Sequence, residues 1–295
     1  MEKIYSCITD SGVPYVHVTG IPKTDIYKTF DCGQCFRFDE VRLFGNKYEY
    51  AGVAYGRYVV FGQDRTDEIK IYYSTEQEYS TLWKRYLALD TDYEKINANI
   101  IEISASEHMK RAVMYGDGIR ILRQEPWECV CSFIISQNNN IPRIKKIIYA
   151  LSQKYGHPIV CGDMTHYAFP EAASLYEAGE DAIFALKTGF RAKYIIDAAR
   201  SVSSSEIVLD NVLKEESFDT CMDILCKIKG VGPKVASCAL LFGFGKTEAF
   251  PIDVWMKRAL AKYFPNGLDI KALGKDAGIA QQYLFYYERY NKDEI

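Results

Sequence analysis

Lys234 and Asp253 are the residues of this chain whose types and spacing best suit covalent chemistry. Lys234 follows the sequence Gly-Val-Gly-Pro, and Asp253 comes nineteen residues later, after Pro251 and Ile252. A lysine amine can attack carbon and form a Schiff base, and a carboxylate can stabilise the cationic centre that develops. The pair therefore predicts nucleophilic catalysis by an amine beside one negative charge.

The residues before Lys234 predict two helices joined by a hairpin turn. Apolar side chains recur at helical spacing over residues 219–228, and Gly230 and Gly232 follow as a tight turn. Pro233 has a preset φ and no N–H group, so it suits the first turn of the second helix. Free backbone N–H groups at such a turn form an anion site, and the helix dipole there disfavours a charged ammonium.

Asp253 has the residue type of an N-cap for a helix over residues 254–263, which stops before Pro265. Taken alone, these features are also compatible with a purely structural role. The glycine pair could be an ordinary interhelical turn, Lys234 a solvated lysine and Asp253 only a cap.

The longer string from Leu225 to Ala259 is more specific. It reads LCKIKGVGPKVASCALLFGFGKTEAFPIDVWMKRA and resembles the helix-hairpin-helix, Gly/Pro-Asp superfamily of DNA base-excision glycosylases, with its pattern L-x-x-[IL]-x-G-V-G-x-K-V-A-x-C followed by P-[VI]-D-V. The resemblance implies that Lys234 and Asp253 are the catalytic lysine and aspartate.

Four further segments resemble 8-oxoguanine DNA glycosylases within that superfamily. They are CGQCFRF (32–38), LRQEPWECVCSFIISQNNNIPRI (122–144), TGFRAKYI (188–195) and AGIAQQYLFYYER (277–289). The similarity therefore runs in order along nearly the whole chain.

The resemblance implies a set of DNA-reading and base-reading residues. Asn138 would fill the space left by a flipped base, Arg143 and Arg191 would read the opposite cytosine, and Gly230 and Gly232 would bind phosphate. The base pocket would use Cys238 and Phe285 as a sandwich, Gln281 on the base edge and the carbonyl of Gly33 as acceptor for the N7–H of 8-oxoguanine. Taken singly, Cys238 and Phe285 are more typical of a helical core, Gln281 of an exposed surface and the three asparagines of a polar turn.

The predicted fold class is α+β. Short runs of β-branched and aromatic residues, PYVHVTG, KYEYAGVAYG, RYVVFG and DEIKIYYS, predict an antiparallel sheet up to about residue 75, and helical periodicity dominates from Glu76 onward. We expect a sheet domain with flanking helices over residues 1–110 and a helical region over 111–295, with the helix-hairpin-helix at about 219–244. The family resemblance implies an active site in the cleft between the domains.

Composition narrows the class of protein further. The chain has 295 residues, 48% of them apolar, and no apolar run long enough to span a membrane. Its net charge of -3 argues against indiscriminate binding to nucleic acid, but residues 227–262 carry seven Lys or Arg against two acidic residues. Nine irregularly spaced cysteines without a secretory signal indicate reduced thiols in an intracellular protein.

No redox or nucleotide cofactor is expected. No cysteine follows Cys238, so the four-cysteine iron-sulfur loop of related glycosylases is absent. By resemblance, the carbonyls of Cys226, Ile228 and Val231 hold a structural monovalent cation. Cys32 and Cys35 have the spacing of a metal or redox pair, without an apparent second pair or histidine partner.

The expected partner is double-stranded DNA that carries 8-oxoguanine opposite cytosine. We expect the protein to act as a monomer and to be associated with DNA inside the cell, in the nucleoid if the source is prokaryotic. Eukaryotic members of the family commonly have a phosphate-contacting histidine at the position of Trp255. The tryptophan puts that phosphate contact in doubt and indicates a different branch of the family, plausibly prokaryotic. Two alternatives remain: an alkylpurine glycosylase of the same superfamily, against which Lys234 speaks, and a non-catalytic helix-hairpin-helix module, which has no use for Asp253.

Overall fold

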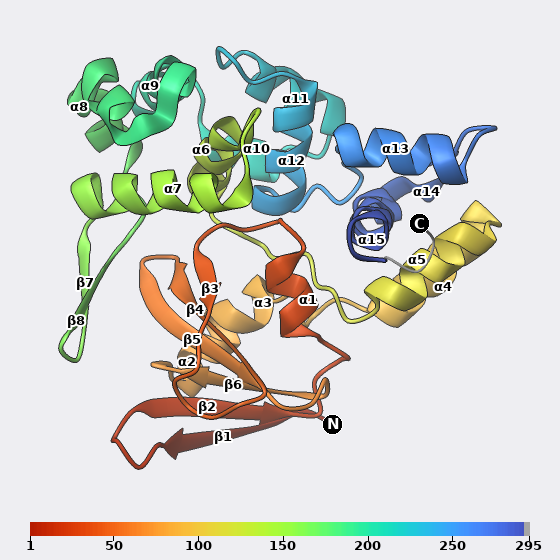
Figure 1. Cartoon of the computed structure of the whole chain (residues 1–295), viewed down its shortest axis with the longest axis horizontal. Coiled ribbons are helices and arrows are strands. Elements are labelled where there is room, and N and C mark those ends of the chain that lie inside the picture. The colour runs from red at the N-terminus through yellow and green to blue at the C-terminus, as the bar shows by residue number, and fades with distance from the viewer. Residues whose placement is uncertain (292–295) are drawn as a thin grey trace.

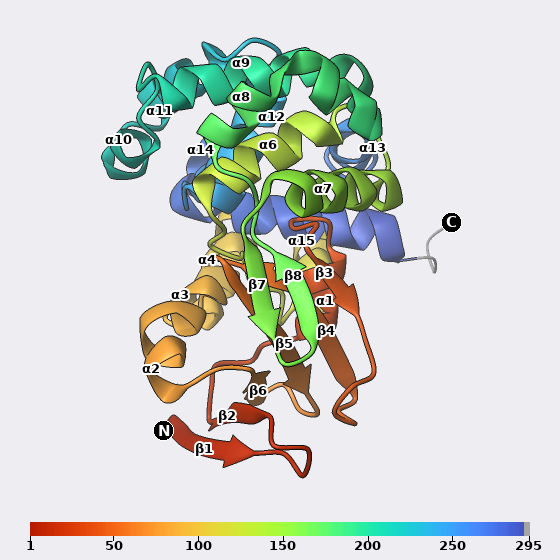
Figure 2. The same ribbon diagram turned by 90° about the vertical axis from the view of Figure 1, so that its left-hand side faces the viewer.

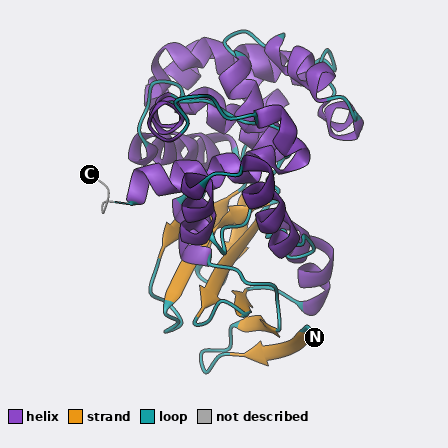
Figure 3. Cartoon of the chain, turned by 90° about the vertical axis from the view of Figure 1, so that its right-hand side faces the viewer, coloured by secondary structure: helices purple, strands orange, loops and turns teal. Residues whose placement is uncertain are grey.

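The computed structural model describes residues 1–291 and consists of an antiparallel sheet beneath a larger assembly of helices (Figures 1 and 3). The six strands follow the order β1-β2-β6-β5-β4-β3, and every neighbouring pair is antiparallel. Their bounds are β1 (Lys3–Ile8), β2 (Pro14–Thr19), β3 (Phe38–Glu40), β4 (Tyr48–Ala54), β5 (Arg57–Gln63) and β6 (Glu68–Tyr72).

Strands β2 and β6 alternate buried and partly exposed side chains with a period of two, whereas β5 is buried along nearly its whole length. On one face of β2 and β6, Val16, Val18, Ile69 and Ile71 are each at most 1% exposed. Helix α1 (Ile26–Asp31) covers this face with Phe30, whose ring stacks on Phe61 of β5 at 5.5 Å. A π-helical turn over residues 79–83 joins the short helices α2 (Glu76–Glu78) and α3 (Lys84–Tyr86). The turn and α3 complete the same core with Tyr79, Trp83 and Tyr86.

The helical region has a separate core, in which α12 packs against α6, and α15 packs against α5 and α13. Its helices are α4 (Tyr93–Ser104), α5 (Glu107–Gly116), α6 (Pro126–Ser136), α7 (Ile141–Tyr155), α8 (Ala172–Ile183), α9 (Ala192–Ser203), α10 (Leu209–Lys214), α11 (Phe218–Cys226), α12 (Pro233–Gly243), α13 (Val254–Tyr263), α14 (Ile270–Leu273) and α15 (Ala277–Tyr290). Within the described residues, no helix is both long enough and apolar enough to cross a lipid bilayer.

The α+β class and the four predicted strands are confirmed, but the expectation that the chain stays helical after Glu76 is wrong. Strands β7 (Pro158–Cys161) and β8 (Met164–Tyr167) form a hairpin that hangs from the helical region and lies beside β5 (Figure 2). Gly162, at φ 58°, makes the turn, and the flanking runs of four residues are too short for helices. The boundary near residue 110 stays a prediction; α4 and α5 contribute buried side chains to the helical core.

A buried arginine ties the sheet to the helices. Arg120, 1% exposed, donates to the carbonyl of Lys23 at 2.6 Å, to that of Thr91 at 3.2 Å and to the hydroxyl of Thr24 at 3.2 Å. Its guanidinium also lies 4.3 Å from the centre of the Tyr93 ring. Arg120 therefore satisfies carbonyls from both sides of the junction at once.

We predict that Arg120→Leu lowers the free energy of unfolding by about 3 kcal/mol, because it leaves buried carbonyl groups without donors. Urea denaturation followed by circular dichroism measures this loss. Arg65→Gln is the control, since Arg65 is exposed and pairs with the exposed Asp67, and its effect stays within about 0.5 kcal/mol. Equal stability of the two variants would contradict the role of Arg120.

Candidate active site at the helix-hairpin-helix

The predicted helix-hairpin-helix is present. Helix α11 ends at Cys226 and α12 begins at Pro233. Gly230 adopts φ 82° and packs so closely on Tyr194 of α9 that any Cβ would collide with the ring, so this position requires glycine. The amide of Val231 donates to the carbonyl of Ile228 at 3.0 Å and closes the turn.

Asp253 is the N-cap of α13, which spans Val254–Tyr263 as the sequence predicted. Its Oδ1 accepts the amide of Met256 at 2.8 Å. One carboxylate oxygen is thereby held at the helix start, and the half-buried side chain remains at the edge of a cavity. A purely structural role accounts for Asp253 as a helix cap but not for its position at the cavity.

One cavity brings together Lys234, Asp253 and all four residues predicted for the base pocket. Its volume is about 60 Å³. The predicted residues that line it are Lys234, Asp253, Gly33, Cys238, Gln281 and Phe285, and the residues that sequence reasoning missed are Cys32, Phe133, Phe242, Pro251 and Gln282. These positions come from segments more than 200 residues apart in the chain.

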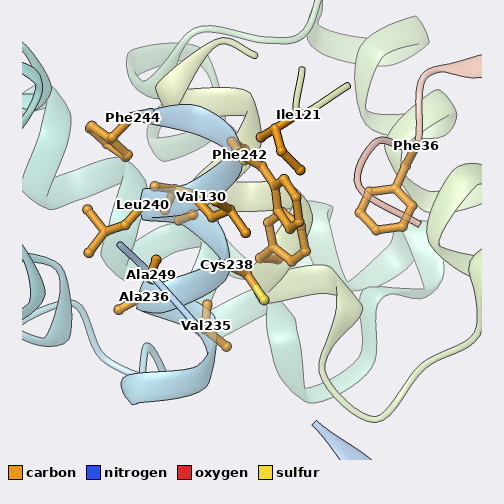
Figure 4. Close-up of a cluster of buried hydrophobic side chains, with 14 of the residues drawn as sticks. Phe36, Ile121, Val130, Val235, Ala236, Cys238, Leu240, Phe242, Phe244 and Ala249 are labelled. Carbon is orange, nitrogen blue, oxygen red and sulfur yellow. The ribbon is translucent and has the colours of Figure 1, made fainter. Parts of the chain in front are cut away.

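The missed aromatic residues form the floor of this cavity. Phe133 of α6 and Phe242 of α12 stack at 5.5 Å, and the Lys234 Nζ lies 5.6 Å from the centre of the Phe133 ring. Figure 4 shows Cys238 and Phe242 on the side of α12 that faces Phe36, with Leu240 and Phe244 on the other side. Because both faces of this helix are apolar, the sequence gives no sign of which aromatics reach the lysine.

Burial raises the pKa of the Cys238 thiol, and the nearby Lys234 ammonium opposes that shift. Cys238 is 4% exposed, so it offers the cavity a neutral, polarisable wall. Gln281 of α15 lines the same cavity, is 5% exposed, and its Oε1 has no hydrogen-bond partner in the described part of the chain. A buried acceptor without a donor is costly and suggests that a ligand supplies one.

Helix α15 also holds the segment that presents Gly33. The side-chain amide of Gln282 donates to the carbonyl of Cys32 at 2.9 Å, and the hydroxyl of Tyr290 donates to the carbonyl of Asp31 at 3.0 Å. Gly33 has φ 79°, a conformation that glycine adopts without strain. Its backbone therefore faces the cavity in a fixed orientation.

Gln34 fixes the other side of this segment. Fully buried, it donates to the carbonyls of Thr29 at 2.9 Å and Arg120 at 2.7 Å, and it accepts the amide of Leu122 at 2.8 Å. The backbone carbonyl of Gln34 accepts a hydrogen bond from the side-chain amide of Gln124 at 2.7 Å. The loop from the sheet domain is thus joined to the stretch that leads into α6.

The DNA-reading candidates cluster at the start of α7. Asn138 is exposed and adopts φ 47°, a left-handed conformation that asparagine tolerates better than most residues. Arg191, 2% exposed, donates to the carbonyls of Gln137, Asn138 and Thr188, so in this conformation it supports the asparagine turn. Arg143 is exposed and bonds the Lys187 carbonyl at 3.2 Å.

Trp255 lies on the exposed side of α13. Its ring is 40% exposed, and the guanidinium of Arg258 lies 5.3 Å from the ring centre. Ile252 and Val254, on either side of Asp253, are 39% and 63% exposed. The surface beside the carboxylate is therefore apolar and aromatic.

Cys32 and Cys35 are buried thiols. Cys32 donates to the carbonyl of Thr29 at 3.2 Å, and burial raises its pKa to about 12. Burial also raises the pKa of Cys35, and residues 1–291 contain no cluster of three or more side chains suited to a metal ion. These observations favour a structural role for the pair over a redox role.

Two family models match adjacent parts of the chain. The N-terminal domain of 8-oxoguanine DNA glycosylase matches residues 19–130, and the HhH-GPD superfamily of base excision DNA repair proteins matches residues 131–271. The solved structure of Clostridium acetobutylicum 8-oxoguanine glycosylase/lyase, in complex with double-stranded DNA that contains cytosine opposite 8-oxoG, has 36% sequence identity and a TM-score of 0.87 and covers 98% of both chains. The chain belongs to the 8-oxoguanine DNA glycosylase family. The predicted family is therefore confirmed.

Two further proteins are also similar to this chain. MBOgg1, solved in complex with a low affinity DNA ligand, has 38% identity and a TM-score of 0.87, over 97% of this chain and 98% of that chain. The N-glycosylase/DNA lyase of Saccharomyces cerevisiae is 32% identical over 216 residues, which cover 68% of this chain and 57% of the yeast enzyme. The yeast enzyme is therefore matched over little more than half its length.

We predict that iodoacetamide at pH 8 modifies Cys226 well before Cys32 or Cys35. The pKa values of all three thiols are raised, but Cys226 is exposed to the reagent, whereas Cys32 and Cys35 are buried. Mass spectrometry of tryptic peptides after timed quenching gives the order of labelling. Early labelling of Cys32 in the folded protein would support the redox alternative instead.

Proposed function

We propose that this chain is a bifunctional DNA repair enzyme that excises 8-oxoguanine and then cleaves the abasic strand. The observation that carries the proposal is the single cavity lined by Lys234, Asp253 and the unsatisfied Gln281 carbonyl. A nucleophile, a counter-charge and a base-edge acceptor are thus available to one bound nucleotide.

The proposed chemistry begins at C1′ of the deoxyribose. The neutral amine of Lys234 forms a bond to C1′ while the N-glycosidic bond breaks and the base leaves with the bonding electrons and takes up a proton. Asp253 stabilises the positive charge that develops on the sugar. The attached amine gives up a proton, and the C1′–O4′ bond then breaks, so that the sugar ring opens, O4′ takes up a proton and a protonated Schiff base forms between C1′ and Lys234. Loss of a proton from C2′ and β-elimination then expel the 3′ phosphate and nick the strand.

Lesion recognition rests on hydrogen bonds at two edges of the base. The Gln281 Oε1 accepts from the Watson-Crick edge of guanine, which carries N–H donors, and the Gly33 carbonyl accepts the N7–H that only the oxidised base carries. Cys238 and Phe285 enclose the ring between them. A hydrogen-bonding site discriminates between two bases more strongly than an apolar pocket does, because the wrong base leaves buried polar groups unpaired.

The cavity is smaller than the roughly 300 Å³ or more of a typical ligand pocket, so it opens when a base enters. Phe285 is the only half-buried side chain of the predicted sandwich, whereas Cys238 is 4% exposed. We therefore assign the opening movement to Phe285 on α15. The base itself arrives by flipping out of the duplex.

The DNA is held on both sides of the flipped nucleotide. The amides of Gly230 and Gly232 have no acceptor within residues 1–291 and are available to a phosphate. Asn138, at the tip of its turn, fills the gap in the duplex, and Arg143 reads the opposite cytosine. Arg191 also contacts the opposite cytosine once its hydrogen bonds to the carbonyls of Gln137 and Asn138 have broken.

The hairpin also fits a monovalent cation. In the described part of the chain the carbonyls of Cys226 and Val231 receive no hydrogen bond, and that of Ile228 accepts only the Val231 amide. Carbonyl oxygens are the ligands that hard cations prefer. Bound there, the ion would add positive charge beside the phosphate, and the chemistry at Lys234 does not require it.

The two alternatives explain less of the site. An alkylpurine glycosylase uses the aspartate without a lysine, so it leaves Lys234 in the cavity without a role. A non-catalytic DNA-binding module needs the hairpin but neither Asp253 nor the unpartnered Gln281 acceptor.

We further propose that the enzyme acts as a monomer on DNA inside the cell, in the nucleoid if the source is prokaryotic.

We predict that borohydride traps the wild-type protein covalently on duplex DNA with 8-oxoguanine opposite cytosine, and that Lys234→Gln abolishes the adduct. The glutamine side chain cannot form a Schiff base. Denaturing electrophoresis of labelled duplexes with each of the four opposite bases measures trapping, and cytosine gives the highest yield. Lys229→Gln, which removes an exposed lysine of the same hairpin, is the control and retains trapping.

The absence of a trapped species with any opposite base would exclude the lyase step. A trapped species that persists in Lys234→Gln would show that another amine is the nucleophile.

We also predict that Asp253→Asn retains binding to the lesion duplex but lowers single-turnover excision about 100-fold or more, since the charge that stabilises the sugar cation is lost. The asparagine oxygen still caps α13, so the fold is preserved. Rapid-quench assays and anisotropy binding separate the two effects. Excision at the wild-type rate would remove Asp253 from the mechanism.

A further inference from the structure

Arg289 lies beside Gly33 and Phe285, two of the residues that line the cavity, and has no assigned role. It lies in the last turn of α15, half-buried, and its Nη1 is 3.5 Å from the point where a Cβ on Gly33 would stand. Among residues 1–291, no carboxylate lies within 4.0 Å of it. A cation held at a substrate pocket without a counter-charge suggests an anionic part of the substrate.

Two aromatic rings hold this guanidinium in place. Its carbon lies 5.0 Å from the centre of the Tyr290 ring and 6.0 Å from that of Phe285. Tyr290 is itself anchored through its hydroxyl to the carbonyl of Asp31 at 3.0 Å. The side chain is therefore ordered before a ligand arrives, which reduces the entropy lost on binding.

Arg289 lies between the base pocket and the asparagine turn. Around the same point at Gly33, Phe285 approaches from α15 at 3.8 Å and Ile141 from the first position of α7 at 3.9 Å. Ile141 directly follows the three asparagines. The acidic neighbour Glu288 is directed to Lys262, at 4.0 Å, so it does not neutralise Arg289.

We infer that Arg289 binds a backbone phosphate of the nucleotide that has been flipped into the cavity. This inference rests on the proposed function, because only a flipped nucleotide brings its phosphates to the rim. A phosphate is the stronger candidate over the base, since a guanidinium binds an oxyanion through two parallel charge-assisted bonds. Arg289 also contacts Phe285, so it links the grip on the backbone to the wall of the base pocket.

The test compares Arg289→Gln and Arg289→Lys, each in a Lys234→Gln background that prevents turnover. Fluorescence anisotropy measures the affinity for three duplexes: 8-oxoguanine opposite cytosine, a tetrahydrofuran abasic analogue opposite cytosine, and undamaged DNA. Arg57→Gln is the matched control, because Arg57 is half-exposed in the sheet and pairs with Glu78. Thermal melting of each variant checks that the fold is intact.

We expect Arg289→Gln to weaken binding to both damaged duplexes by about tenfold and by the same factor, because both present the phosphate of a flipped nucleotide. The dependence of log affinity on log salt falls by about one for these duplexes, and binding to undamaged DNA is unchanged. Arg289→Lys keeps the salt dependence but recovers only part of the affinity. Arg57→Gln matches the parent protein throughout.

Three results would overturn the inference: unchanged binding in Arg289→Gln, a loss confined to the duplex that still carries the base, or an equal loss on undamaged DNA. The second would mean that Arg289 reads the base, and the third that it binds DNA without regard to flipping. A failure of the proposed function is distinguishable, since it would appear as absence of excision by the wild-type protein whatever Arg289 does.

Discussion

The hydrogen bonds of Gln34 are the constraint on which the rest of the site depends. A single buried amide joins the end of α1 to the stretch before α6, and its own carbonyl is held by Gln124. Gly33 precedes it, so the position of one backbone carbonyl at the cavity is fixed by two separate parts of the chain. The sheet domain thus contributes to the site through a loop, while Lys234 comes from α12 and Asp253 from the start of α13.

Helix α15 is the second support. It carries Gln281 and Phe285 toward the cavity, and on the same helix Gln282 and Tyr290 bond the backbone of the Asp31–Gly33 segment. Residues that line the cavity and residues that hold the Asp31–Gly33 backbone therefore alternate along one helix. This arrangement keeps the two predicted recognition edges, Gly33 and Gln281, at a constant separation.

Local signals made the helix-hairpin-helix and the Asp253 cap predictable from the sequence, since glycine, proline and a capping aspartate each impose a backbone conformation on their own neighbourhood. The β7–β8 hairpin escaped prediction because four-residue strands carry too little periodicity. The bonds of Arg191 and Gln34 escaped it too, because they depend on partners brought close only by tertiary packing. Family resemblance supplied Gly33 and Gln281, which no local pattern distinguishes from surface residues.

The small size of the cavity has a consequence for how such an enzyme would search DNA. Because the free protein has room for far less than a purine, each insertion costs the free energy of opening. With the proposed recognition at Gly33, a normal guanine, which has an acceptor at N7, would not recover that cost, and its residence in the pocket would be short. Most encounters with intact base pairs therefore end before insertion, and the protein moves on along the duplex.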